Sequence, residues 1–215
     1  METKRKLSNL GIGILFTLFF ISIGVIIVIN CRSIYQHDVT ALNLVEQTGY
    51  SQDEIMKNYN ALIDYCSPLN MGELRFPTLP SSESALSHFK EVKDIFIAFY
   101  FIAAISGIML IIAVFYKRRK KEYRYLKTSS ITCIVLPLLV GTACAINFDQ
   151  TFILFHKLFF NNDDWLFDPR TDPIILLLPE EFFLHCAIFI VIFVLFGSGI
   201  LYLLYRRHKK QEDLI

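Results

Sequence analysis

Four stretches of the sequence are almost free of charged residues, and each is about as long as the roughly 20 residues that a helix needs to cross a bilayer. They are residues 10–30, 95–116, 129–148 and 182–205. Because lipid offers no hydrogen-bond partner to an open backbone, an apolar stretch of this length is expected to form a helix. The sequence therefore predicts an all-α polytopic membrane protein with four transmembrane helices.

Basic residues are concentrated in the short segments that flank these stretches. Residues 1–9, 117–128 and 206–215 contain three, seven and four of them, which is 14 of the 21 in the chain. The longer connections, 31–94 and 149–181, contain 7 basic and 16 acidic residues. Because cytosolic segments carry the excess of Lys and Arg, we expect both termini in the cytosol. Residues 31–94 would then form an extracellular cap and 149–181 a second extracellular loop. This distribution is typical of a topology signal, so no nucleic-acid partner is expected.

The cap contains two helix start signals and one segment without a clear pattern. Ser51 and Glu54 form a capping box, and apolar residues then recur at helical spacing, which predicts an amphipathic helix over about 52–66. A second start signal at residues 81–83 predicts a helix that continues without a break into the second span. Residues 31–50 are poorly periodic, and no helix is predicted there.

The second connection is rich in aromatic residues. Asp149 or Thr151 can cap a short helix over about 151–160. Its aromatic face would consist of Phe152, Phe155, His156, Phe159 and Phe160. Residues 174–178 are apolar but too short to cross a membrane, so we expect them in the membrane interface. The fourth span begins at Pro179-Glu180-Glu181, where a proline and two acids suit a helix N-terminus.

Two of the five histidines stand out by their positions. His88 lies seven residues before Ile95, about 10 Å above the apolar boundary at 1.5 Å per residue. His156 lies on the predicted aromatic helix, on the same extracellular side. Because an ordinary imidazole titrates near pH 6.5, such a pair could provide one proton acceptor and one proton donor. The alternative is that each histidine only caps or packs an interfacial helix.

The other histidines have weaker settings. His37 follows the first span without a helical or aromatic context, and His208 lies in the solvated cytosolic tail. His185 lies one turn into the fourth span, beside Glu181, where a packing role and a functional role are both open.

Several classes of active site lack their sequence signals. The chain has neither H-E-x-x-H nor C-x-x-C spacing, so no metal site and no cofactor are expected. It also lacks the G-x-S-x-G turn of serine hydrolases. The order Glu180-Glu181-x-x-x-His185 is similar to the paired-glutamate motif of the intramembrane prenyl-protein proteases. That family has arginine in place of His185 and needs more spans, so this interpretation is rejected.

Three motifs in the second half of the chain resemble a known family. They are F-H-x-x-F-F at 155–160, W-x-x-D-P at 165–169 and L-P-E-x-F-F at 178–183, and His88-Phe89 before the second span adds a shorter match. Together with the length and the four spans, they resemble the bacterial lipoprotein intramolecular transacylase family, Lit.

The resemblance implies a substrate, a reaction and a set of site residues. The substrate would be a diacylglyceryl-modified lipoprotein in the bacterial plasma membrane, whose sn-2 acyl chain moves to the α-amino group of the N-terminal cysteine to give the lyso-form. The family's two catalytic histidines match His88 and His156. We expect substrate-binding walls or contacts from Phe155, Phe159, Trp165, Asp168, Glu180 and Phe182. Besides the lipoprotein, membrane lipid is an expected partner, and the oligomeric state is not predicted.

The chemistry of this transfer suits a site without a protein nucleophile. The substrate's own amine attacks the ester carbonyl through an eight-membered ring, which closes only when the chain is held in one conformation. One histidine could take the amine proton while the other supports the oxyanion and protonates the glycerol oxygen. Two rival functions remain open: a non-catalytic membrane protein that binds lipid or a partner through its cap, and an acyl hydrolase or transferase with another acceptor.

Overall fold

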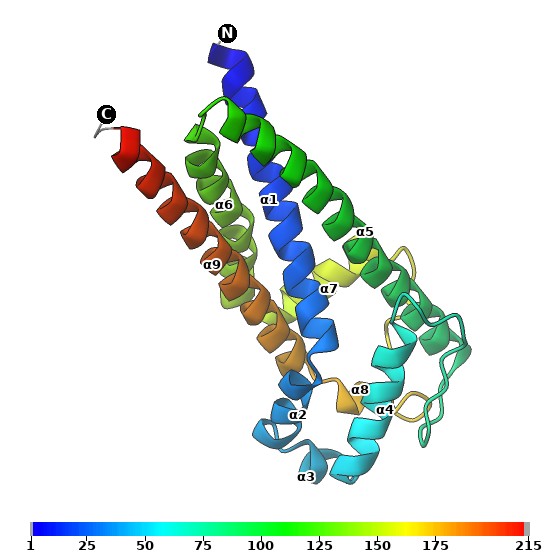
Figure 1. Ribbon diagram of the computed structural model, residues 1–215. Helices are drawn as coiled ribbons and strands as arrows, with labels where there is room; N and C mark the ends of the chain where they lie inside the picture. The colour runs from blue at the N-terminus through cyan, green and yellow to red at the C-terminus, as the bar shows by residue number, and fades with distance from the viewer. Residues whose placement is uncertain (1, 213–215) are drawn as a thin grey trace. The chain divides into compact units, whose positions relative to one another are not determined.

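The structure, a computed structural model, describes residues 2–212 of the chain, with side chains for 2–210, and forms no strand in this range. Figure 1 shows the helices in chain order. They are α1 (Glu2–Asn30), α2 (Arg32–Ala41), α3 (Leu44–Thr48), α4 (Gln52–Tyr65), α5 (Glu83–Arg119), α6 (Arg124–Ile146), α7 (Phe148–Phe159), α8 (Ile174–Leu177) and α9 (Glu180–Glu212). The predicted all-α class is confirmed.

Within the described residues, four helices are long and apolar enough to cross a membrane, namely α1, α5, α6 and α9. Helices α1, α5 and α9 contain the apolar stretches 10–30, 95–116 and 182–205, whereas α6 ends at Ile146, two residues before the predicted end of the stretch 129–148. Helix α5 is 37 residues long and includes the charged residues before the second stretch, so the predicted continuous helix is confirmed. Its start is fixed by Ser82, whose hydroxyl accepts a hydrogen bond of 3.1 Å from the Ala85 amide.

The chain divides into two compact units, each of which is described by itself. Unit 1 consists of residues 2–25, 99–145 and 188–212 and contains most of the four long helices. Its buried core includes Ile12, Leu110, Cys133 and Val194. Two polar contacts add to the apolar packing: Ser198 Oγ donates to the Ser130 carbonyl at 2.7 Å, and Thr17 Oγ1 donates to Cys133 Sγ at 3.5 Å.

Two glycines in unit 1 permit a close approach of neighbouring helices. A Cβ atom on Gly13 of α1 would lie 2.7 Å from Thr132 Oγ1 and 3.3 Å from the Ser129 backbone of α6. A Cβ atom on Gly197 of α9 would lie 2.8 Å from the Phe20 ring. Small residues at helix interfaces are a common feature of membrane proteins, because van der Waals packing must replace the hydrophobic effect there.

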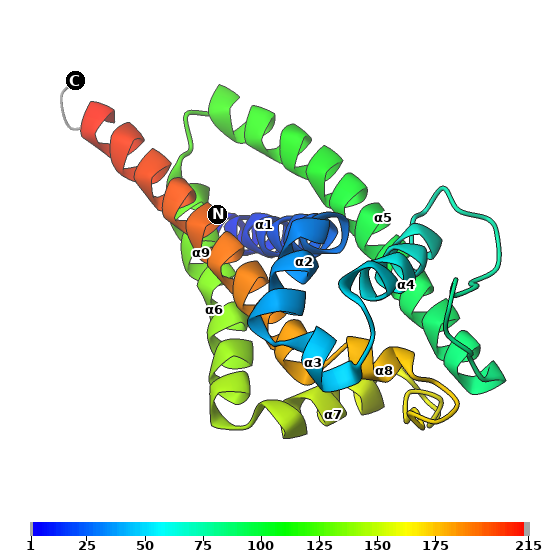
Figure 2. The same cartoon turned by 90° about the horizontal axis from the view of Figure 1, so that it is seen from below.

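Unit 2 consists of Ile26–Ala98 and Ile146–Ala187. Helices α2, α3, α4 and α8 contact one another around an apolar core, as Figures 1 and 2 show. The Tyr35 and Tyr59 rings stack at its centre with centroids 3.7 Å apart. The Tyr35 hydroxyl donates to the Leu177 carbonyl at 2.6 Å and so connects the cap to the second connection. Asp172, also buried, accepts from the Ser82 amide and hydroxyl at 2.6 and 2.9 Å.

Local sequence signals predicted part of unit 2 correctly. Helix α4 begins at the expected capping box, where Ser51 Oγ accepts from the Glu54 amide and Glu54 accepts from the Ser51 amide. Helices α2 and α3 were not predicted. Each is too short to show a stable period, and the inward face of α2 includes the acid Asp38 beside Tyr35 and Val39.

The predicted start of the aromatic helix was wrong in detail. Helix α7 begins at Phe148, and its cap is Asn147, whose Oδ1 accepts from the Gln150 amide at 2.9 Å, rather than Asp149 or Thr151.

The placement of the apolar segment 174–178 in the membrane interface stays a prediction. Ile174 and Leu177 of α8 are fully buried in the core of unit 2, which accounts for their apolar character.

Candidate active site

His88 and His156 lie side by side within unit 2. Their ring centroids are 5.8 Å apart, and the ring planes are inclined by 33°. Helix α5 provides His88 and helix α7 provides His156, 68 residues later in the chain. Both are buried, with 6% and 9% of their surface exposed. The convergence of the two imidazoles expected from the sequence is therefore present in the structure.

One hydrogen bond determines the protonation pattern of His156. Its Nδ1 lies 2.9 Å from the carbonyl oxygen of Phe152, one turn earlier in α7. Because a carbonyl oxygen only accepts, Nδ1 must carry the hydrogen, and in the neutral imidazole Nε2 is then an acceptor. Burial lowers the pKa of His156 below its ordinary value of 6.5, and the hydrogen bond to Phe152 opposes this shift in part. The neutral ring can therefore accept a proton at Nε2.

Aromatic rings enclose His156 on two sides. Trp165 stacks on it with centroids 4.9 Å apart and an interplanar angle of 30°. Phe152 lies 4.3 Å away. Phe155 contacts the imidazole edge-on at 5.6 Å. These rings keep water from the imidazole and restrict the directions from which a substrate can reach it.

His88 has an aromatic environment of its own. Phe160 packs against it edge-on at 4.6 Å, and Phe167 at 5.5 Å. Its Nδ1 is buried and has no hydrogen-bond partner among the described residues. An unpaired buried polar atom costs about 1–3 kcal/mol, so such groups in a native structure call for an explanation such as a functional role.

Asn162 connects the loop after α7 to the helix that provides His88. Its side-chain amide donates to Glu91 Oε1 at 2.9 Å, and Glu91 follows His88 by three residues on α5. The Asn162 carbonyl accepts from Trp165 Nε1 at 3.1 Å, and its Oδ1 accepts from the Asp164 amide at 3.1 Å. Asn162 thereby holds Trp165 over His156. The second carboxylate oxygen of Glu91 is buried and has no partner among the described residues.

Three of the predicted substrate-binding residues lie at or near the histidine pair. Trp165 and Phe155 contact His156 directly. Phe159 packs on Phe155 at 4.7 Å. Phe155 and Phe159 are about half exposed, at 46% and 53%, and so present an open aromatic face of α7.

The other three predicted residues have different surroundings. Phe182 is buried against Tyr35 and Tyr59, with ring centroids 5.1 and 6.0 Å away. Asp168 binds the exposed Arg170 guanidinium at 2.6 Å, and this hydrogen-bonded partner lowers the pKa of Asp168 to about 2. Glu180 lies in the first turn of α9. A substrate-binding role for these three remains a prediction.

The sequence placed Phe152 and Phe160 on the aromatic face of the helix without assigning them to the site, and it did not single out Phe167, Asn162 and Glu91. Phe152 and Phe160 lie four residues before and after His156, and this spacing placed them on its face of the helix. Phe167, Asn162 and Glu91 had no comparable local signal.

A second histidine contact in unit 2 involves His185. Its Nδ1 lies 2.9 Å from Asp38 Oδ2, and the Asp38 side chain is only 3% exposed. This contact connects α2 to the first turns of α9. A buried carboxylate with a hydrogen-bonded imidazole is a satisfied structural pair, which supports the packing role of His185.

Among the described residues, no group of three or more His, Cys, Asp or Glu side chains could hold a metal ion. The two histidines face each other and aromatic rings. Such an arrangement can transfer a proton in largely apolar surroundings.

Comparisons with known proteins give a consistent result. The family model for the lipoprotein intramolecular transacylase Lit matches residues 10–183. The in meso structure of the membrane integral lipoprotein intramolecular transacylase Lit from Bacillus cereus is 35% identical, with a TM-score of 0.95 and full coverage of both chains. Two structures of variants of that protein, with one histidine replaced by arginine or by alanine, match with TM-scores of 0.89 and 0.90. They cover 99% and 100% of this chain, 95% and 97% of their own, and are also 35% identical. No curated protein sequence matches the chain.

Proposed function

Because the chain belongs to the lipoprotein intramolecular transacylase family, Lit, we propose that His88 and His156 catalyse acyl transfer within a diacylglyceryl-modified lipoprotein. The observation that carries this proposal is the pairing of the two buried imidazoles, 5.8 Å apart, inside a wall of aromatic rings. An apolar wall suits a substrate whose reacting ester connects a fatty acyl chain to glycerol.

The reaction is an isomerisation of the substrate, so it consumes no water and no co-substrate. The α-amino nitrogen of the N-terminal cysteine forms a bond to the carbonyl carbon of the sn-2 ester. The bond from this carbon to the glycerol oxygen then breaks, and the glycerol oxygen gains the proton that the amine lost. The α-amino group has an ordinary pKa of about 7.7–8.0, so part of it is already the neutral amine at neutral pH, and the base only has to take the proton that this amine loses as it attacks.

The tautomer of His156 supports the role of base for this residue. With Nδ1 held by the Phe152 carbonyl, Nε2 accepts the proton from the attacking amine and returns it to the glycerol oxygen. His88, neutral in its apolar setting, donates a ring N–H to the oxyanion of the tetrahedral intermediate.

The aromatic wall supplies the positioning that an eight-membered transition state needs. Trp165 and Phe152 restrict the space at His156, and Phe160 does so at His88. Holding both ends of the reacting chain in one conformation lowers the entropic part of the activation free energy. In well-oriented intramolecular reactions this effect reaches about 7–11 kcal/mol.

The same proposal includes an orientation in the bacterial plasma membrane. The 14 basic residues in the three short segments support cytosolic termini, with the histidine site on the outer side. Lipoproteins that carry the diacylglyceryl anchor outside the cell would meet the site there.

Replacement of either histidine tests the function directly. His88→Ala and His156→Ala should each lower lyso-form lipoprotein in cells by about 10²–10⁴-fold, as expected for loss of an oxyanion donor and of a general base, respectively. Mass spectrometry of lipoprotein N-terminal peptides measures the product, and immunoblots of the membrane fraction check that the variants accumulate. His156→Gln should be as inactive as the alanine variant, because an amide cannot take up a proton at neutral pH. Full activity of His156→Gln would favour a non-catalytic role of His156. Release of free fatty acid would show that the protein is a hydrolase instead.

A further inference from the structure

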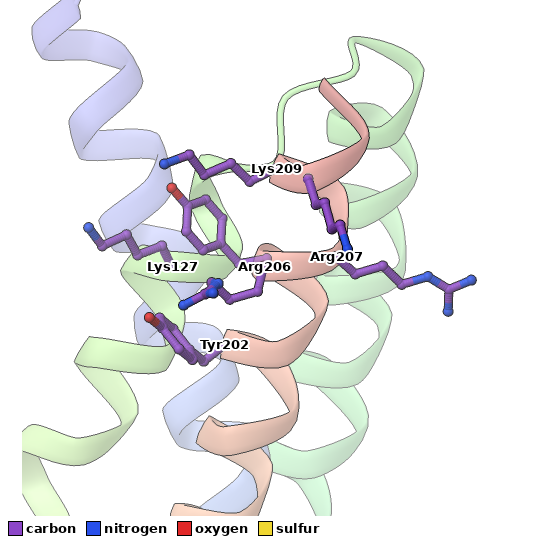
Figure 3. A pocket seen from close by; sticks show the side chains of 7 residues that line it. Lys127, Tyr202, Arg206, Arg207 and Lys209 are labelled. Carbon is purple, nitrogen blue, oxygen red and sulfur yellow. The ribbon is translucent and has the colours of Figure 1, made fainter. Parts of the chain in front are cut away.

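A basic cavity of about 550 Å³ lies between α6 and α9 in unit 1, away from any residue used above. Lys127 of α6 and Tyr202, Arg206 and Lys209 of α9 line it, and their side chains extend toward the same side of α9 (Figure 3). Arg207 also belongs to the lining but turns its guanidinium to the other side (Figure 3).

The cations of this cavity are not neutralised by the protein within the described side chains, residues 2–210. No acidic residue of that range lines the cavity, and neither Lys127 nor Arg206 forms an ion pair there. Lys117, by contrast, is buried and paired with Glu122 at 2.8 Å. Converging positive charges without a counter-charge attract an anion.

The residues that follow Lys127 on its own face of α6 are apolar and exposed. Ile131, Ile134 and Leu138 follow it at spacings of four, three and four residues, so they form one stripe along the helix. All three side chains are exposed in unit 1. A positive group thus stands at the end of a long apolar surface.

Helix α9 repeats this arrangement. On the face of α9 that carries Arg206, the preceding residues at helical spacing include Tyr202, Leu195 and Ile192, and all three are exposed. Tyrosine at the end of a membrane-crossing helix is typical of the headgroup region, where its ring lies in apolar surroundings and its hydroxyl can donate to a phosphate.

We propose that this cavity binds the phosphate headgroup of an anionic phospholipid, with the acyl chains along the two apolar stripes. A positive-inside signal accounts for the number of basic residues in these segments, but it does not require them to converge with tyrosines around a cavity. Basic pockets between membrane helices are a known way to hold anionic headgroups. The apolar stripes favour a lipid over free phosphate, because a soluble anion would use the cations alone.

Lipid retention by the purified full-length protein tests the proposal. The protein is exchanged into detergent with either phosphatidylglycerol or phosphatidylcholine, and bound lipid is measured by native mass spectrometry. We expect phosphatidylglycerol to be retained preferentially. The double variant Lys127→Gln/Arg206→Gln should weaken this retention by about tenfold or more, since each basic residue near a charged lipid contributes substantially.

The matched control is Lys120→Gln/Lys121→Gln, which removes the same charge from exposed lysines that do not line the cavity. It should retain phosphatidylglycerol like the unmodified protein. Equal losses in both double variants would overturn the proposal, because binding would then follow net charge alone, and so would equal retention of the two lipids. Displacement of the lipid by millimolar inorganic phosphate would assign the cavity to free phosphate instead. Equal melting temperatures in phosphatidylcholine show that both variants are folded.

Discussion

The hydrogen bond from His156 to a backbone carbonyl decides which of its nitrogens can exchange a proton. Because the acceptor is a main-chain carbonyl of the same helix, it stays in place whichever side chain Phe152 carries, as long as α7 remains folded. The stacked Trp165 ring adds desolvation on one face of the imidazole. At the residue scale, a fixed tautomer and a neutral ring are therefore built into α7 and the loop that follows it.

Titration of His156 should occur at lower pH than for an ordinary histidine. Its pKa is lowered by burial, so the ring stays neutral and basic as the pH falls through 6.5 and becomes protonated only below that value. Trp165, the only tryptophan of the chain, stacks on this ring and reports its charge. We expect a Trp165 fluorescence transition centred below pH 6.5 that is absent in His156→Gln. A transition at or above 6.5 would contradict the assigned environment.

Asn162 is expected to act as a positioning residue. Asn162→Ala removes the bond to Glu91 and the bond from the Asp164 amide to Asn162 Oδ1, both of which support the loop that presents Trp165 to His156. We expect kcat to fall by about tenfold, because the aromatic wall is no longer held in place. The accompanying signature is a red shift of Trp165 emission and easier quenching by acrylamide. Loss of activity without any change in emission would show that Asn162 acts in another way.

At the scale of elements, unit 1 depends on a close approach of α1 and α6. Apolar side chains give little net drive for association when lipid is the alternative environment, so contact distance matters more than apolar area. Gly13 is the point where the two helices leave no room for a side chain.

The pair Gly13 and Gly11 provides a matched test on one helix. A Cβ atom at Gly13 meets Thr132 and the α6 backbone, whereas a Cβ atom at Gly11 meets nothing within 4 Å. Gly13→Ala should destabilise the protein by about 1–3 kcal/mol through overpacking. Gly11→Ala should be neutral or slightly stabilising, because alanine favours the helix. Thermal unfolding in detergent measures both, and an equal effect of the two changes would contradict the close packing.

Sequence reasoning succeeded where one segment carries its own signal. The four spans follow from length and charge, and α4 follows from the Ser51–Glu54 capping box. The placement of Phe182 could not be predicted in this way, since its neighbours Tyr35 and Tyr59 lie more than a hundred residues earlier. The role of Asp38 was also hidden, because its partner His185 is equally distant in sequence.

At the scale of the whole molecule, we propose that the histidine site lies on the outer side of the membrane. The distribution of Lys and Arg supports this orientation, since 14 of the 21 lie in the three short segments. The proposed reaction needs this orientation, because the diacylglyceryl anchor of its substrate is carried outside the cell.

Reporter fusions test the orientation of the chain. A phosphatase that is active only outside the cytosol should be inactive when fused after residue 215 and active when inserted in the exposed turn at residues 70–72 of the cap. The physical reason is that short segments rich in Lys and Arg are retained on the cytosolic side of the membrane. The opposite pattern would place the histidine pair on the cytosolic side and remove the substrate from its reach.

The most direct measurement is a crossover experiment with purified protein. Two synthetic diacylglyceryl lipopeptides, one with an isotope-labelled sn-2 chain and one with a labelled peptide, are mixed and followed by tandem mass spectrometry. We expect the labelled chain only on the amine of its own unlabelled peptide and the unlabelled chain only on the labelled peptide, with unchanged total masses, and we expect His88→Ala and His156→Ala to lose this transfer. Products that carry both labels, or undiminished transfer in either variant, would contradict intramolecular catalysis by the histidine pair.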